Sequence, residues 1–146
     1  MTVPDTVNAL SNRVVGAAIE VHRHLGPGLL ESAYEACLCA ELASSGVEFV
    51  RQQPLPIVYK NMRLDAGYVL EIVVGDSIVL ELKSVERLLP VHEAQVITYL
   101  KPTGLPLGLL INFNVPLLRS GIKRFANTQE PKRTFAPSVA FAVKKT

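Results

Sequence analysis

Two glutamates and a lysine stand in the most aliphatic part of this sequence. The segment 67–83 reads GYVLEIVVGDSIVLELK, and apart from Asp76 its charged residues are Glu71, Glu81 and Lys83. A charge within an apolar run is costly to bury unless a group of opposite charge accompanies it. Two carboxylates directly opposite each other on paired strands repel unless something positive lies between them. The pattern therefore predicts a divalent cation between Glu71 and Glu81, with Lys83 as a further positive charge.

The spacing around Asp76 predicts how these residues face one another. The residues 75–77, Gly-Asp-Ser, are typical of a three-residue hairpin loop. With Asp76 at the centre of the turn, Glu71 lies opposite Glu81 and Val69 lies opposite Lys83. The other face is then wholly aliphatic and is formed by Leu70, Ile72, Val74, Ile78, Leu80 and Leu82. A two-residue turn would break both pairings. The alternative is an exposed strand on which Glu81 and Lys83 are merely hydrated.

The elements that must hold this hairpin follow from the hydrophobic periodicity and from the positions of glycine and proline. Helices are predicted over 6–25, 29–44 and 90–101. Short extended segments are predicted over 48–52 and 55–60, where Pro54 and Pro56 indicate an edge strand or a bend. Stronger strands are predicted over 67–74, 77–84 and 105–113, followed by a short element over 117–125. This order predicts one α/β domain with a mixed β-sheet flanked by helices.

Composition limits the class of protein. The chain has 146 residues, 19% of them charged, and a formal net charge of +2. This is the length of one domain, which we expect over residues 1–125, with 126–146 as a C-terminal tail or, over 135–143, an added edge strand. We find no apolar run long enough to span a bilayer and no secretory signal, so we expect a cytoplasmic protein. Cys37 and Cys39 are expected to be buried structural thiols.

Three further motifs resemble a known family. Residues 28–34 read GLLESAY and match the GxxExxY signature of a family of small bacterial proteins, and the segments 88–99 and 108–116 also look like that family. The resemblance covers roughly residues 6–125. The family is placed in the PD-(D/E)XK nuclease superfamily, which implies a restriction-endonuclease-like fold. We expect Tyr34 of this signature to pack beside Glu31 and to hydrogen-bond it.

The resemblance implies a set of metal ligands. Glu81 and Lys83 match the (D/E)xK motif, and Glu71 stands where the superfamily normally has aspartate on the preceding strand. Glu31 matches the acidic residue of the core helix that can join the metal shell. These matches imply Mg²⁺ or Mn²⁺ held by Glu71, Glu81 and Glu31. Asp65 also fits the family pattern and competes for a place in the site, although a turn residue is the simpler interpretation.

The resemblance also implies a reaction, the hydrolysis of a phosphodiester bond in DNA or RNA. Lys83 would orient or deprotonate the attacking water and stabilise charge on the phosphate. Gln95 and Tyr99 match a QxxxY element, and their i, i+4 spacing places both on one helix face together with His92. They would position the lysine or the substrate backbone. Candidate phosphate contacts are Lys60, Arg63, Lys101, Arg119, Lys123 and Arg124.

Two departures from the family pattern leave an alternative open. The family usually has arginine and aspartate where this chain has Val69 and Glu71. The longer glutamate displaces its oxygens, and octahedral Mg²⁺ tolerates misplacement poorly. The alternative is a catalytically weakened nuclease-like module that binds nucleic acid or a protein partner without cutting. A homodimer through exposed apolar positions of the segment 105–116 is also possible, although a buried core strand would explain them equally well.

Overall fold

A computed structural model describes residues 3–127 of the chain. Its helices are α1 (Asp5–Leu25), α2 (Glu31–Ser44) and α3 (Pro90–Thr103), with a 3₁₀ turn η1 (Leu118–Gly121). Its strands are β1 (Phe49–Tyr59), β2 (Met62–Val74), β3 (Ile78–Lys83), β4 (Leu107–Asn112) and β5 (Ile122–Ala126). They form one sheet in the order β1-β2-β3-β4-β5, in which β3 and β4 are parallel and the other neighbours are antiparallel. The predicted α/β class with a mixed sheet is confirmed.

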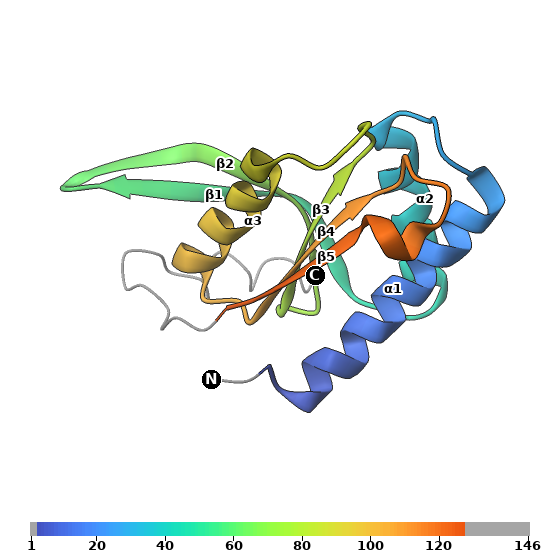
Figure 1. Cartoon of the computed structure of the whole chain (residues 1–146). Helices are drawn as coiled ribbons and strands as arrows, with labels where there is room; N and C mark the ends of the chain where they lie inside the picture. The colour runs from blue at the N-terminus through green and yellow to red at the C-terminus, as the bar shows by residue number, and fades with distance from the viewer. Residues whose placement is uncertain (1–2, 128–146) are drawn as a thin grey trace.

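The helices cover the two faces of the sheet unequally. Figure 1 shows α1 and α2 on one side of the central strands and α3 on the other. Buried residues of α1 and α2 pack with one set of strand side chains, which includes Ile72, Leu80 and Leu109. Buried residues of α3 pack with the alternate set, which includes Val73 and Val79. Strand β4 is buried along its whole length, so the apolar residues 107–112 belong to the core and offer no surface for a dimer.

Strand β1 is continuous, contrary to the prediction of two short segments. Its prolines are tolerated because β1 is an edge strand of the sheet and needs partners on one side only. The interruption that the sequence indicated is instead a register shift between Leu55 and Ile57. Strand β2 is correspondingly longer than predicted and begins at Met62 rather than Gly67. At Gly67 any larger residue would collide with the Ile57 side chain, which lies 2.1 Å from the position of a Cβ atom.

The β2–β3 hairpin has the predicted register only near its turn. Val74, Val73 and Ile72 pair with Ile78, Val79 and Leu80 as expected. Beyond this point β2 leaves β3, so the predicted pairs Leu70–Leu82 and Val69–Lys83 are not in the ladder. Leu70 packs on the α3 side although Ile72 packs on the α1–α2 side. Residues two apart in a regular strand share a face, so β2 must twist at Glu71.

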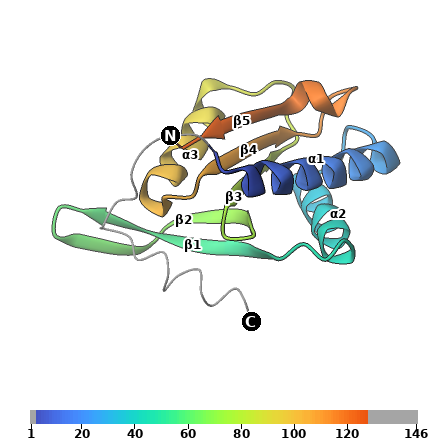
Figure 2. The same ribbon diagram turned by 90° about the horizontal axis from the view of Figure 1, so that it is seen from below.

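After that twist β1 and β2 continue together as a two-stranded ribbon, residues 54–69, which we call the arm. Figures 1 and 2 show it running out past α3, away from the rest of the sheet. Pairing continues along the arm from Pro54–Val69 to Tyr59–Met62 at its tip. The acid residue Glu71 therefore lies where the arm joins the sheet.

The remaining predictions concern the chain ends, the cysteines and the membrane. The segment predicted over 117–125 forms η1 and β5, while the proposed edge strand over 135–143 lies outside the described residues. Cys39 is buried, but Cys37 is exposed, so the prediction of two buried thiols is half wrong. Over residues 3–127, no helix has the length and apolar character that a bilayer crossing requires.

Candidate active site

Glu71 and Glu81 face each other where β2 and β3 separate. The Leu82 N–H donates to Oε1 of Glu71 at 2.9 Å, and the Glu71 N–H donates to Oε2 of Glu81 at 3.3 Å. Each carboxylate thus accepts a backbone N–H of the opposite strand at the level where the regular ladder stops. We call these two residues the acid pair. The predicted juxtaposition of Glu71 and Glu81 is present, held by side chains rather than by the strand ladder.

The acid pair carries strongly perturbed acidities. Glu81 is only 3% exposed, and burial, reinforced by the charge of Glu71, raises its pKa to about 8. Burial also raises the pKa of Glu71, opposed by the Leu82 N–H and the Lys83 ammonium. Two neighbouring carboxyls do not both ionise readily, because each charge disfavours the other. Without a cation the pair therefore keeps a proton above the pH at which a free glutamate loses one.

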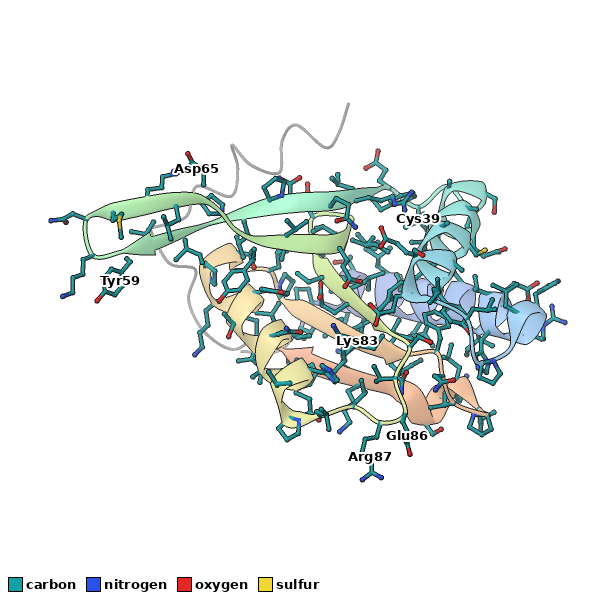
Figure 3. The ribbon with its side chains drawn as sticks, turned by 90° about the horizontal axis from the view of Figure 1, so that it is seen from above. Cys39, Tyr59, Asp65, Lys83, Glu86 and Arg87 are labelled. Carbon is teal, nitrogen blue, oxygen red and sulfur yellow. The ribbon has the colours of Figure 1, made fainter. Side chains whose placement is uncertain are left out.

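Lys83 is held at the end of β3 by the neighbouring parallel strand. It pairs with Asn112 of β4, and the Phe113 N–H donates to its carbonyl oxygen at 2.9 Å. The Asn112 amide is 2% exposed and clamps the next loop, donating to the Val85 carbonyl and accepting from the Val85 N–H. Figure 3 shows Lys83 near the centre of the molecule, with Glu86 and Arg87 pointing outward on the loop beyond. Asn112 belongs to the family-like segment 108–116, but that motif did not predict that the Asn112 amide would hold the next loop.

Helix α2 brings a third carboxylate to the same end of β3. The Ser84 N–H donates to Oε2 of Glu31 at 3.4 Å, and the Ser84 hydroxyl donates to the Leu29 carbonyl at 2.5 Å. The negative charge of Glu31 contributes to the raised pKa of Glu71. Glu31 therefore lies at the rim of the site, exposed, whereas Glu81 lies at its floor.

Tyr34 does not hydrogen-bond Glu31 as predicted. Its hydroxyl donates to the Gly26 carbonyl at 2.5 Å and accepts from the Leu29 N–H at 3.2 Å. Its ring is fully buried and stacks on Phe113 with a centroid distance of 4.4 Å. Tyr34 thus fastens the loop between α1 and α2, and this loop delivers Glu31 to the site.

Tyr34→Phe should lower the free energy of unfolding by about 1–2 kcal/mol, because it leaves the Gly26 carbonyl and the Leu29 N–H without this partner. Urea denaturation would measure the loss. Tyr59→Phe removes a hydroxyl from an exposed ring and is the matched control. An unchanged midpoint for Tyr34→Phe would show that water replaces the hydroxyl and that the loop does not depend on it.

Glu35 and Gln52 are site residues that sequence reasoning missed. Glu35 lies one turn after Glu31 and accepts hydrogen bonds from Arg51 Nε at 3.1 Å and from Gln52 Nε2 at 3.0 Å. Gln52 has a left-handed backbone with φ 53°, at the level of Glu71 in the β1–β2 register. A non-glycine residue in this region is strained and is held by its surroundings. The i, i+4 spacing of Glu31 and Glu35 indicates that both lie on one face of α2, but no sequence pattern predicts that Glu35 contacts β1.

Helix α3 covers the acid pair from the other side. Tyr99 is 7% exposed, and burial together with the charges of Glu81 and Glu71 raises its pKa to about 12. Its ring meets Tyr68 of β2 edge-on, with a centroid distance of 5.1 Å. Gln95 is half-buried one turn earlier on the same helix. His92, in contrast, accepts the Leu89 N–H at 2.9 Å and so caps the helix.

The other candidate residues do not gather around the acid pair. Asp65 lies on the arm, exposed and ion-paired with Arg63, and Figure 3 shows it far from Lys83. Lys123 forms an ion pair with Glu93, and Arg124 hydrogen-bonds Asn8 near the start of α1. The basic residues predicted as phosphate contacts are therefore dispersed over the arm, α3, η1 and β5.

The donors of the acid pair fit a hard divalent cation. Each carboxylate accepts one backbone N–H, and the two carboxyl groups also hydrogen-bond each other, an arrangement in which a cation could take the place of the shared proton. Within residues 3–127 no group of three or more His, Cys, Asp or Glu side chains converges into a metal shell. Mg²⁺ is commonly held by one or two carboxylates and completes its octahedron with water and substrate phosphate. Glu71 and Glu81 are two such carboxylates, and the charge of Glu31 acts on Glu71.

Comparisons with known proteins agree with this geometry. The family model of the PD-(D/E)XK nuclease superfamily matches residues 8–125, a range that contains the acid pair, Glu31, Lys83, Gln95 and Tyr99. Neither the curated proteins nor the solved structures gave a significant match.

Proposed function

Because the chain belongs to the PD-(D/E)XK nuclease superfamily, we propose that it hydrolyses phosphodiester bonds of DNA or RNA with Mg²⁺ or Mn²⁺ as cofactor. The observation that carries this proposal is the acid pair, a buried and a half-buried carboxylate on adjacent strands, with Lys83 two residues beyond Glu81. Like charges are rarely buried together without a functional reason, since the arrangement destabilises the fold.

Each residue has a distinct role in the proposed reaction. Glu71 and Glu81 hold the cation, which when bound polarises the phosphate and favours hydroxide near neutral pH. Lys83 orients the attacking water and stabilises the charge that develops on the phosphate. Gln95 and Tyr99 form the wall opposite the strands and position the lysine or the substrate backbone. Glu31 contributes at the rim through water.

A weakened, non-cutting module is the second candidate, and the residues at two positions favour it. Val69 is exposed on the arm where the family usually has arginine, so a positive charge beside the site is missing. Glu71 replaces the shorter aspartate at the position that holds the cation. Such a module would still bind nucleic acid, but it would leave it intact.

One assay separates the two candidates. End-labelled single-stranded DNA, duplex DNA and RNA are incubated with the wild-type protein and Mg²⁺ or Mn²⁺, and the products are resolved by length. We expect cleavage that EDTA stops, together with a rise in melting temperature on addition of millimolar Mn²⁺ because the cation offsets the repulsion of the acid pair. A protein that gains no stability from Mn²⁺ and cuts none of the three substrates would favour the binding module.

A further inference from the structure

The arm carries an unusual share of the exposed apolar surface. Of the thirteen large apolar side chains that are exposed within residues 3–127, six lie on its sixteen residues; these are Val58, Tyr59, Met62, Leu64, Tyr68 and Val69. An apolar concentration of this kind on a projecting element marks a binding surface. Strand addition at the free edge of β1 is disfavoured by Pro54 and Pro56, so the side chains rather than the edge offer the contact.

Four of these six side chains form one stripe. Cross-strand pairs join Leu55 with Tyr68, Ile57 with Leu64 and Tyr59 with Met62. The pairs Ile57–Leu64 and Tyr59–Met62 share one face of the arm, because their members lie two residues apart on each strand. Tyr68 lies on the other side of the register shift and faces α3, since its ring meets Tyr99. Figure 3 shows Tyr59 on the side where α3 lies and Asp65 on the opposite side. The stripe is therefore apolar and aromatic, and the charged residue Asp65 is kept off it.

The stripe leads directly into the acid pair. At its inner end Tyr68, 37% exposed, touches Tyr99, which lies close enough to Glu71 and Glu81 to feel their charges. At its outer end Tyr59, 58% exposed, has the Lys60 ammonium 5.4 Å from its ring centroid. The arm thus carries an aromatic ring at each end and a cation at its tip, and its inner ring contacts a residue beside the acid pair.

We propose that the arm binds a single strand of nucleic acid and leads it to the acid pair, with bases against Tyr59 and Tyr68 and phosphate at Lys60. Aromatic rings flanked by cations bind unpaired bases, whose faces are free for stacking. A duplex hides those faces, so the arm distinguishes single strands from duplexes. This inference rests on the proposed function and adds a substrate class to it.

The test measures binding without cleavage. Fluorescein-labelled single-stranded DNA of twenty nucleotides, and the same sequence as a duplex, are titrated in EDTA and followed by anisotropy. Stacking supplies about tenfold in affinity for each ring, so Tyr59→Ala should weaken single-strand binding about tenfold and Tyr59→Ala with Tyr68→Ala about a hundredfold. Tyr59→Phe should bind normally because it keeps the ring. Leu117→Ala, which truncates an equally exposed apolar residue before η1, is the matched control.

The possible results test the role of the arm separately from the proposed function. Tyr59 is far from the acid pair, so an unchanged affinity of Tyr59→Ala for single-stranded DNA overturns the role of the arm. Binding of the duplex as tightly as the single strand overturns it as well. Sedimentation could instead reveal a dimer that Tyr59→Ala abolishes while nucleic-acid binding is unaffected. That result assigns the stripe to contact with a second copy of the chain and also overturns the proposed role of the arm. The proposed function is judged independently by Mn²⁺-dependent hydrolysis of bis(p-nitrophenyl) phosphate, a substrate too small to reach the arm.

Discussion

Replacing Glu81 by glutamine should abolish metal-dependent cleavage and at the same time stabilise the metal-free protein at pH 8. Removing a residue that hydrogen-bonds a metal ligand typically lowers metal affinity or activity about 10- to 100-fold. Removing a ligand itself should therefore lower activity at least about a hundredfold. Glutamine keeps the shape and can still accept the Glu71 N–H, but it carries no charge to bury. Activity and stability should therefore change in opposite directions.

The stability difference has a definite pH dependence. An unfolded glutamate titrates near pH 4.3, whereas burial and Glu71 raise the pKa of folded Glu81 to about 8. As the pH rises between these values, the unfolded chain loses its proton while the folded chain retains it. Wild-type stability should fall across this window by up to about 1.4 kcal/mol per pH unit, and Glu81→Gln should remove most of that slope. The raised pKa of Glu71 acts in the same direction and leaves a residual slope.

Denaturant unfolding in EDTA at pH 5, 6, 7 and 8 measures this effect, alongside cleavage at pH 8. Glu86→Gln is the matched control, because Glu86 is exposed on the loop after β3 and should change neither property. Mn²⁺ should restore wild-type stability at pH 8 and leave Glu81→Gln unaffected. A variant that still cuts DNA or RNA at the wild-type rate contradicts the ligand role, and one with the wild-type pH slope contradicts the buried charge.

The sequence predicted the acid pair because two local rules agreed on one register. The loop 75–77 fixed the turn, and the alternation of aliphatic residues fixed which face each glutamate takes. The rules failed at Leu70, since they assume that a strand stays regular, whereas β2 twists where it leaves β3. The twist is set at the level of Gln52, whose left-handed backbone is held through Glu35 of a distant helix. Such a contact has no signal in the local pattern of either segment.

Long-range packing also explains the other errors. Glu31 and Tyr34 lie three apart on one helix, which made a hydrogen bond between them plausible, but Tyr34 is drawn inward by its stacking on Phe113. The prolines of β1 correctly indicated an edge strand, but the segment was predicted as two short pieces, whereas an edge strand lacks the second partner whose hydrogen bonds the prolines would disrupt and so stays continuous. In both cases local residue types were interpreted correctly, and the tertiary neighbour decided the structure.

Lys83→Met should reduce cleavage by about 10²- to 10⁴-fold, the range that a positioned proton-transfer or charge-stabilising group contributes. Lys83→Arg separates those two roles, because arginine keeps the charge but does not release a proton near neutral pH. Lys83 lowers the pKa of both Glu71 and Glu81, so it acts on the site as a cation. We therefore expect Lys83→Arg to retain about a tenth of the activity and Lys83→Met less than a hundredth.

The same cation gives Lys83→Met a signature that does not depend on catalysis. Without the ammonium the acid pair should hold its protons to higher pH, and the fall in metal-free stability should extend further above pH 8 than in the wild type. Lys123→Met removes the lysine of β5 that forms an ion pair with Glu93 of α3, and it should match the wild type in both measurements. If Lys83→Met keeps wild-type cleavage, the charge that stabilises the reacting phosphate must come from elsewhere. If it loses cleavage without moving the pH profile, Lys83 acts on the substrate but does not neutralise the acid pair.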